Sequence, residues 1–273
     1  MCARQPEIES SRIPPDRSLD LLFPKRSCAS SLRRVLPSKN WRPENVARLV
    51  VWLSASWLAS GAMAIGLAAS WRQDGRQFPP LALLAITGIG FHGACLLLVH
   101  AFLRAHRTSW SRGFGFQSQT GSAIRLALAS TLLVAPVLYG IHEGAAHLLE
   151  RWGWPPAPQE SVELLLKSGW GGRLVIAFFA VVMAPVAEET LFRGIFFTVL
   201  RDAGWPRTSV WLVSLVFGLI HGNAAALLPL SLFGGFLAWL YVRTGNLLAP
   251  ITAHLVFNLL PFVLLALGVD FGI

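Results

Sequence analysis

Seven long apolar stretches, separated by short polar segments, constrain this chain more than any other feature. An α-helix needs about 20 apolar residues to cross the roughly 30 Å hydrocarbon core of a bilayer. The pattern therefore predicts an all-α protein, a polytopic transmembrane helical bundle of about seven spans. The fifth stretch is the shortest, and it is separated from the sixth only by Gly222-Asn223. The stretches fall at roughly 46–71, 80–103, 123–148, 173–200, 208–223, 225–242 and 247–268.

The charged residues are few and concentrated at the N-terminus. Hydrophobic residues make up 54% of the chain and charged residues 14%, whereas soluble domains carry about 25% charged residues. Ten of the 23 Lys and Arg residues precede Trp52. We expect residues 1–44 to be a disordered basic cytoplasmic tail and residues 45–273 to be the transmembrane domain. The net charge of +9 predicts attraction to the anionic surface of the lipid bilayer, and no nucleic-acid partner, because the charge lies in a tail rather than on a folded surface.

The loops between the apolar stretches predict the orientation of the protein. Loops rich in Lys and Arg alternate with loops that contain few, beginning with the basic tail. This pattern favours an integral membrane protein with a cytoplasmic N-terminus, and the tail and small size suggest a bacterial inner (plasma) membrane. Tryptophans at the expected helix ends are typical of an interfacial aromatic belt: Trp41, Trp71, Trp110, Trp152, Trp154, Trp170 and Trp205.

Three charged side chains lie in the interior of the fourth apolar stretch, well inside Arg173 at its start. Glu188, Glu189 and Arg193 follow one another in an otherwise apolar segment, and each mid-membrane charge costs about 2.5–3.5 kcal/mol on insertion scales. Glu189 and Arg193 are spaced i, i+4 and can form an ion pair along one face. Glu188 points about 100° away. We therefore expect a structural pair beside a carboxylate without a local partner.

Polar side chains also occur in the fifth and seventh stretches. His221 ends the fifth stretch one turn after Phe217, and His254 and Asn258 share one face of the seventh. At 1.5 Å per residue, Glu188 and His221 lie roughly 20 Å from the cytoplasmic ends of their helices, His254 about 12 Å and Asn258 about 18 Å. Intramembrane groups of this kind face the bundle interior or a water-filled cavity. The spacing predicts one layer of polar groups.

The chemistry of this layer suits attack of water on a carbonyl. A carboxylate in a low-dielectric site accepts a proton from water, an imidazole orients that water, and His and Asn stabilise an oxyanion. Metal-dependent catalysis is an alternative. Glu188, His221 and His254 are candidate ligands of a divalent ion such as zinc, although they lack the His-Glu-x-x-His spacing. No Ser-His-Asp or Cys-His arrangement is apparent, and the three cysteines fit no metal or redox motif.

Structural interpretations compete with these functional ones. The pair Glu189–Arg193 can serve only to hold helices together, and a lone intramembrane histidine such as His100 or His142 is typically a structural or interfacial residue. The run Phe-Gly-Gly-Phe at 233–236 is typical of a small-residue packing surface. The case for function depends on the four polar groups being together.

Three motifs in order resemble a known family. Glu188-Glu189-x-x-x-Arg193, Phe217-x-x-x-His221 and His254-x-x-x-Asn258 look like those of the CPBP family of intramembrane proteases. This family includes the type II CAAX prenyl endopeptidases and the bacterial Abi-type proteins linked to bacteriocin processing and immunity. The resemblance covers about residues 173–260, which we take as the catalytic core.

The resemblance implies an intramembrane endopeptidase that cuts a membrane-associated protein or peptide near the interface. By analogy, Glu188 and His221 activate water, His254 and Asn258 form the oxyanion site, and Glu189 with Arg193 shapes the catalytic helix. Family members are described both as glutamic proteases and as metalloproteases, and the motif residues leave this open, with metal-free catalysis favoured slightly. Two alternatives remain: a non-catalytic immunity or scaffold protein, and a proton-coupled transporter.

Overall fold

The computed structural model describes residue 36 and residues 38–155 and 160–268. Two units are distinguished, with their boundary between Pro37 and Ser38, and everything below concerns the second unit, Ser38–Ile273. Most of the predicted basic tail, residues 1–35 and 37, lies outside the described residues.

The described residues are helical over most of each predicted span and contain no strand, as the sequence predicts, but the fifth span is helical only to Leu219 and ends in a turn. Six helical segments are long and apolar enough to cross a membrane, and a seventh apolar helix is shorter. The protein is therefore a polytopic helical membrane protein. Its elements in chain order are α2 (Pro43–Gln73), α3 (Pro80–Gly88), η1 (Ile89–Gly93), α4 (Ala94–Ala105), α5 (Trp110–Phe114), α6 (Thr120–Arg151), α7 (Glu160–Lys167), α8 (Trp170–Ala177), η2 (Phe178–Met183), α9 (Ala184–Glu189), η3 (Thr190–Phe197), α10 (Thr198–Asp202), α11 (Pro206–Leu219), α12 (Ala224–Thr244) and α13 (Leu248–Ala266).

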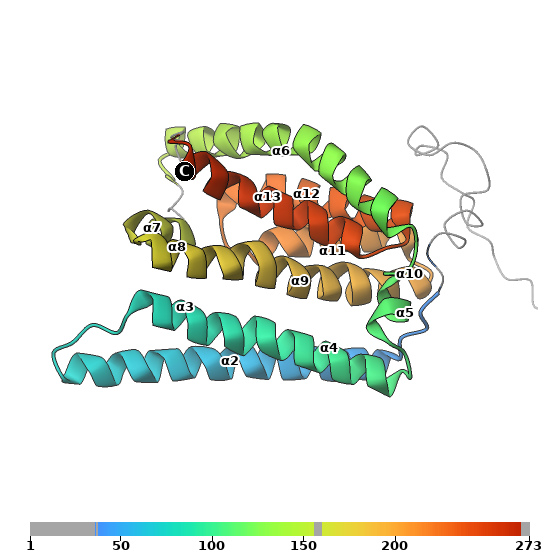
Figure 1. Ribbon diagram of the computed structural model, residues 1–273, viewed down its shortest axis with the longest axis horizontal. Helices are drawn as coiled ribbons and strands as arrows, with labels where there is room; N and C mark the ends of the chain where they lie inside the picture. The colour runs from blue at the N-terminus through green and yellow to red at the C-terminus, as the bar shows by residue number, and fades with distance from the viewer. Residues whose placement is uncertain (1–35, 37, 156–159, 269–273) are drawn as a thin grey trace, which may run out of the picture. The chain divides into compact units, whose positions relative to one another are not determined.

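The span that carries the two glutamates lies between two groups of helices (Figure 1). This span runs continuously from α8 to α10, Trp170–Asp202. On one side α9 contacts η1, in the span next to α2, and on the other side it contacts α13. Helices α6, α11, α12 and α13 pack together on that second side. The central position of α9 explains why charged side chains are tolerated there, because protein covers them.

Three segments, η1, η2 and η3, are π-helical. A π-helical turn contains one more residue than an α-helical turn, which shifts the faces of the flanking helix, and such segments often occur at functional sites. Two of the three directly precede and follow α9, and the third contacts it across the helix interface. The orientation of the glutamates therefore depends on irregular turns that periodicity does not predict.

The turn between α11 and α12 is built from His221, Gly222 and Asn223. Gly222 has φ +65°, a left-handed conformation that glycine adopts without the Cβ penalty of other residues. The Asn223 side chain then accepts a hydrogen bond from Ala226 N–H at 3.0 Å and caps α12. These two residues explain why α11 stops where it does.

Helix α11 is too short to cross a bilayer. Its 14 residues rise about 21 Å, whereas the hydrocarbon core is about 30 Å thick. The turn that carries His221 therefore lies at membrane depth. Irregular backbone at that depth is stable only when protein or a water-filled cavity surrounds it, so this turn is a natural point for water to reach the interior.

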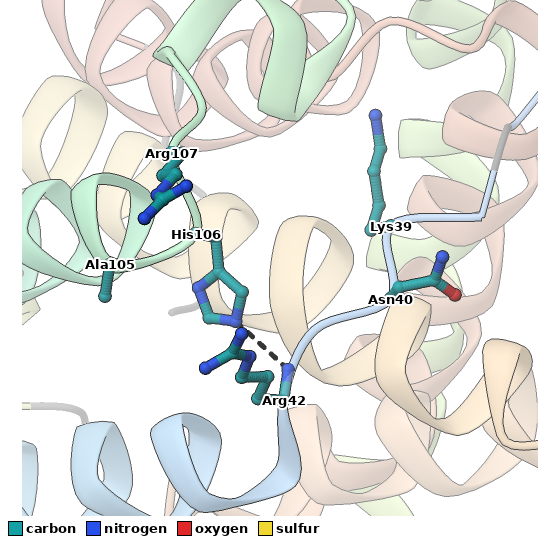
Figure 2. Close-up of a pocket in the computed structure, with 6 residues that line it drawn as sticks. All are labelled: Lys39, Asn40, Arg42, Ala105, His106 and Arg107. Atoms are coloured by element: carbon teal, nitrogen blue, oxygen red, sulfur yellow. Dashed lines mark hydrogen bonds between the residues drawn. The ribbon is translucent and has the colours of Figure 1, made fainter.

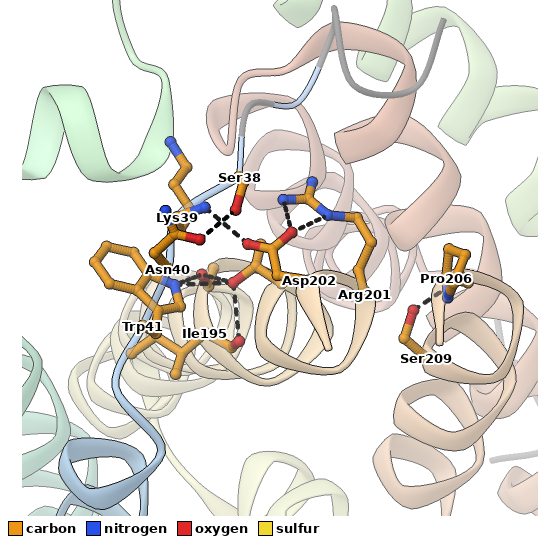
Figure 3. A network of polar contacts seen from close by, with 11 residues as sticks. Ser38, Lys39, Asn40, Trp41, Ile195, Arg201, Asp202, Pro206 and Ser209 are labelled. Atoms are coloured by element: carbon orange, nitrogen blue, oxygen red, sulfur yellow. Dashed lines mark hydrogen bonds and ion pairs between the residues drawn. The ribbon is translucent and has the colours of Figure 1, made fainter. Parts of the chain in front are cut away.

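Residues 38–42, which the sequence places in the disordered tail, make specific contacts ahead of α2 (Figure 3). Trp41 is buried, and its indole N–H donates to Thr198 Oγ1 at 2.9 Å. The backbone N–H of Lys39 donates to Asp202 Oδ2 at 2.7 Å. These contacts join the start of α2 to α10, about 160 residues away in sequence, and such a distant partner leaves no local signal in the sequence.

The glycine pair of α12 provides a matched test of the expected packing surface. A Cβ on Gly234 would lie 2.9 Å from Ser214 Cα, whereas one on Gly235 would be no closer than 3.8 Å to Ser214 Oγ. We expect Gly234→Ala to lower the free energy of unfolding by about 1–3 kcal/mol through overpacking against α11. Gly235→Ala is the control, because alanine favours the helix and its Cβ would meet Ser214 Oγ only at an ordinary van der Waals distance. Denaturant unfolding in micelles measures both, and equal stability of the two variants would contradict close packing at Gly234.

Candidate active site in the membrane interior

A buried ionic cluster joins α9, η3 and α13. Arg193 Nη1 donates to Glu189 Oε1 at 2.7 Å, so the predicted i, i+4 pair is present. His254 Nδ1 lies 2.9 Å from the same Glu189 oxygen. Arg193 and Glu189 have no exposed surface. The Glu189 carboxylate therefore binds both Arg193 and His254. This pairing offsets part of the free-energy cost of burying the charges.

Phe217 is at the centre of the aromatic contacts around this cluster. Its ring lies under the Arg193 guanidinium, 4.5 Å from centroid to Cζ, at a distance that allows a cation–π interaction. The same ring contacts His221 at 4.9 Å and His254 at 5.6 Å between centroids. Thus the Phe217-x-x-x-His221 motif places one aromatic ring between the two histidines and the buried cation.

Glu188 is arranged differently from Glu189. Glu189 is bonded through Oε1 to Arg193 and His254, whereas Glu188 forms no hydrogen bond among the described residues. The Oε2 atoms of both glutamates are buried and have no hydrogen-bond partner there. Buried polar atoms are nearly always paired with protein or water, and an unpaired carboxylate oxygen is costly. The expected division into a structural pair and a carboxylate without a local partner therefore matches the geometry.

The histidines of the membrane interior share one orientation. His221 Nδ1 lies 2.7 Å from Phe217 O, and His92 Nδ1 lies 3.2 Å from Gly88 O. A carbonyl oxygen only accepts, so both Nδ1 atoms carry the proton, and the Nε2 atoms are left as acceptors. In His254 the carboxylate of Glu189 likewise receives the Nδ1 proton. In all three rings Nε2 is the nitrogen available for chemistry.

Asn258 is tied to a π-helical segment. Its Nδ2 donates to Ala180 O, in η2, at 2.8 Å. This bond uses one of the two amide protons and leaves the second proton and the carbonyl oxygen available. The bond links α13 to the segment immediately before α9, so Asn258 also fixes the approach of the helix that carries Glu188.

The expected single layer is only partly assembled by direct contacts. Glu189, Arg193 and His254 are joined, and His221 is linked to them through Phe217. Within the described part of the chain no hydrogen bond connects Glu188 to His221, His254 or Asn258, and Asn258 binds a backbone carbonyl instead. The Phe217 ring therefore connects His221 to His254 and Arg193, whereas Glu188 and Asn258 are not joined to this group by a direct contact.

The candidate metal set of Glu188, His221 and His254 does not fit an ion in this arrangement. No group of three or more His, Cys, Asp or Glu side chains in the described ranges is placed to hold a metal. We therefore derive no step through a metal.

Sequence reasoning missed two residues beside Glu188. The Glu188 carboxylate interacts electrostatically with His92 in η1 and with Cys95 in α4. Cys95 is buried, and its Sγ lies 3.7 Å from Ala187 O. His92 was detectable, because an ionisable residue within an apolar span is a functional candidate by default. Its pairing with α9 was not, because it depends on how the second span packs.

The Glu188–His254 region has a recognisable counterpart among known families. Residues 170–260 match the family model described as "Type II CAAX prenyl endopeptidase Rce1-like". This segment of the chain is Rce1-like. The resemblance drawn from the three motifs is thereby confirmed, and all six predicted site residues fall within the Rce1-like segment.

Three curated proteins are similar in sequence to parts of the chain. The Bacillus subtilis protein YdiL, named as a membrane peptidase, is 28% identical over 166 residues, which cover 60% of this chain and 65% of YdiL. CAAX prenyl protease 2 of Arabidopsis thaliana is 32% identical over 98 residues, covering 28% of this chain and 32% of the relative. An uncharacterized 24.3 kDa protein of Escherichia coli is 34% identical over 82 residues, 27% of this chain and 36% of its own.

These similarities bear on part of each protein. The matched regions cover less than two thirds of each of these relatives, and no solved structure matches the chain. The Rce1-like segment coincides with α8 to α13, which include every helix that carries a predicted site residue. His92 and Cys95 precede the segment, so the span that faces Glu188 from the other side is outside the family match.

Proposed function

We propose that this chain is an intramembrane endopeptidase that hydrolyses a peptide bond with water activated by Glu188. The observation that carries the proposal is the buried, unpartnered Glu188 Oε2 within an Rce1-like segment. A carboxylate that binds nothing in the protein is suited to accept a hydrogen bond from water. The turn of His221 at membrane depth supplies an entry point for that water.

In the proposed reaction Glu188 is the general base. It takes a proton from water while the water oxygen forms a bond to the carbonyl carbon of the substrate. His221 orients the same water through Nε2, the acceptor left by its bond to Phe217 O. The tetrahedral intermediate then collapses, the carbon–nitrogen bond breaks, and Glu188 returns the proton to the leaving amine. General acid–base catalysis of this kind contributes about 10²–10⁴-fold to rate.

His254 and Asn258 are the proposed oxyanion donors. Glu189 accepts the Nδ1 proton of His254, so a second proton on Nε2 would make the ring a cation beside a carboxylate and a donor toward the oxyanion. Asn258 has one amide proton left after its bond to Ala180 O. Glu189 and Arg193 act as positioning residues because they hold the His254 ring.

The proposed substrate is a membrane-associated protein or peptide, cut near the membrane interface. The names of two similar proteins, CAAX prenyl protease 2 and the membrane peptidase YdiL, point to this class. We propose a bacterial inner membrane with the N-terminus in the cytoplasm, in line with the alternation of basic loops. Whether lipidated C-termini are substrates depends on which host proteins carry them.

A quantitative map of protein termini tests the proposal. Host membranes from cells that express the wild type are compared with membranes from cells that express Glu188→Gln at the same level. We expect new termini only with the wild type, and their sequences identify the substrate. Identical maps would contradict proteolysis and would favour a scaffold or a proton-coupled transporter.

His92 provides a separate test of the site. His92 is close enough to Glu188 to interact with it electrostatically, so we expect His92 to position the general base from outside the Rce1-like segment. His92→Phe should slow the appearance of new termini about tenfold and shift the pH dependence of the rate, because the electrostatic environment of Glu188 changes. The control is His100→Phe on the same span, where the ring accepts from Trp110 Nε1–H at 3.2 Å. An unchanged pH profile for His92→Phe would contradict the assignment.

A further inference from the structure

A basic pocket lies at the end of the bundle where α2 begins and α4 ends (Figure 2). Its volume is about 480 Å³. Lys39 and Asn40 line one side of it, and His106 and Arg107 lie across from them, with Arg42 below. Three cationic side chains from two distant segments therefore face one space, and no acidic side chain lines it.

Two of these cations make no contact with protein acceptors. In the described part of the chain, the guanidinium groups of Arg42 and Arg107 form no hydrogen bond or ion pair, and these two residues are bonded through their backbone groups alone. Asp202, which binds the backbone N–H of Lys39 at 2.7 Å, is also paired with Arg201 Nη2 at 2.6 Å. The positive charge of the pocket is therefore not neutralised by the protein.

Lys39 is the third basic side chain of the pocket. Its ammonium group donates to Arg112 O at 3.1 Å and stays close to the pocket. Burial, together with the nearby charge of Arg201, lowers the pKa of Lys39 below its ordinary value, while Asp202 partly opposes the shift. A bound anion would favour the charged form of this lysine.

The backbone around the pocket is held in unusual conformations. Asn40 has φ 47° and Arg107 has φ 50°, left-handed values that non-glycine residues seldom adopt. Only three non-glycine residues in the described ranges have positive φ, and two of them line this pocket. Such strain persists where surrounding contacts impose it, and it gathers at binding sites.

His106 connects the two sides of the pocket. Its Nδ1 donates to Phe102 O at 2.8 Å, so Nε2 accepts the Arg42 backbone N–H at 3.0 Å. The ring also packs edge-on against Trp41, 5.0 Å between centroids. Both ring nitrogens are thus used, and His106 holds Arg42 beside Arg107 rather than acting as a ligand itself.

The position of the pocket identifies the kind of anion. The first candidate span begins at Pro43 and the second ends at Ala105. The residues of the pocket lie at these two helix ends. This is the depth of lipid headgroups, where each Lys or Arg contributes about 1 kcal/mol to attraction by anionic lipid. Arg and Lys together are suited to a phosphate group, Arg through paired N–H donors and Lys as a point charge.

We propose that this pocket binds the phosphate of an anionic phospholipid headgroup, so that one lipid molecule is a specific ligand at the junction of α2 and α4. The site is separate from the proposed active site, and its test does not depend on catalysis. The lipid bridges the segment before α2 and the loop after α4, and it neutralises Arg42 and Arg107.

Lipid competition on the purified full-length protein tests the proposal. Native mass spectrometry in mixed micelles compares retention of phosphatidylglycerol and phosphatidylcholine, with inorganic phosphate as a competitor. We expect the wild type to prefer phosphatidylglycerol. Arg42→Gln/Arg107→Gln should reduce this preference roughly 25-fold, about fivefold for each charge removed. Arg42→Lys/Arg107→Lys keeps both charges and should retain most of it.

The matched control removes the same charge next to the pocket. Arg48→Gln/Arg104→Gln changes two exposed arginines of α2 and α4 that do not line the pocket, and it should leave the preference largely unchanged. An equal loss of phosphatidylglycerol preference in the control would show that the lipid responds to diffuse surface charge, and it would overturn the proposal of a specific site. Displacement of the lipid by inorganic phosphate would assign the pocket to a free anion instead. If the Gln pair fails to fold, Lys39→Gln alone should lower the preference about fivefold.

Discussion

Glu188→Gln is expected to lower the rate of proteolysis about 10³-fold while the protein remains folded. The amide cannot take a proton from water, and a general base contributes about 10²–10⁴-fold. Glu188 Oε2 has no partner in the described protein, so no packing contact is lost. Removal of a buried carboxylate can even raise stability. The rate at which new termini appear after induction measures activity, and denaturant unfolding in micelles measures stability.

The combination of the two readouts distinguishes catalysis from structure. Glu143→Gln is the control, because Glu143 is an acid on α6 whose side chain is 42% exposed, and we expect no effect on either measurement. A Glu188→Gln variant that loses activity only because it unfolds would argue for a structural carboxylate. A folded variant with normal activity would rule out Glu188 as the general base.

Removal of Glu189 is expected to have the largest effect on stability. In Glu189→Gln the buried Arg193 keeps its charge but loses its carboxylate, and breaking a buried pair in this way costs about 3–5 kcal/mol. Arg193→Met should cost less, because His254 remains as a potential cation beside Glu189. The double variant Glu189→Gln/Arg193→Met should recover part of the loss, because no isolated charge is left.

Glu163→Gln is a control with the same sequence spacing. Glu163 and Lys167 form an i, i+4 pair with both side chains exposed, and exposed pairs contribute little, so we expect no measurable change in unfolding. If Glu189→Gln and Glu163→Gln had the same free energy of unfolding, the buried cluster would not be stabilising the packing of α9 against α13. Loss of activity without loss of stability in Glu189→Gln would instead point to a direct role in the reaction.

The architecture was accessible from the sequence because it depends on local composition. Apolar length predicts the spans, and the short fifth stretch corresponds to α11, the helix below spanning length. Pairs along one helix were equally accessible. The Glu189–Arg193 bond and the Phe217–His221 ring contact both follow from i, i+4 spacing.

Contacts between helices were not accessible in the same way. His254 bonds to Glu189 and not to Glu188. Which of the two glutamates it meets depends on the rotation of α13 relative to α9. Three π-helical segments change such rotations, and α-helical periodicity does not reveal them. His92 beside Glu188 and Trp41 against Thr198 likewise result from packing of the first two spans.

The brevity of α11 has a consequence for the surrounding lipid. Its outward face is apolar and exposed, including Trp211, Leu215 and Leu219, so acyl chains lie directly against a helix about 21 Å tall. Lipids adapt to a short hydrophobic surface by local thinning, at a modest cost for each ångström of mismatch. The leaflet beside α11 should therefore be compressed toward the His221 turn. A substrate helix that drifts into this thinned zone would have its end lowered toward the depth of Glu188, so the bilayer itself would contribute to the selection of what is cut.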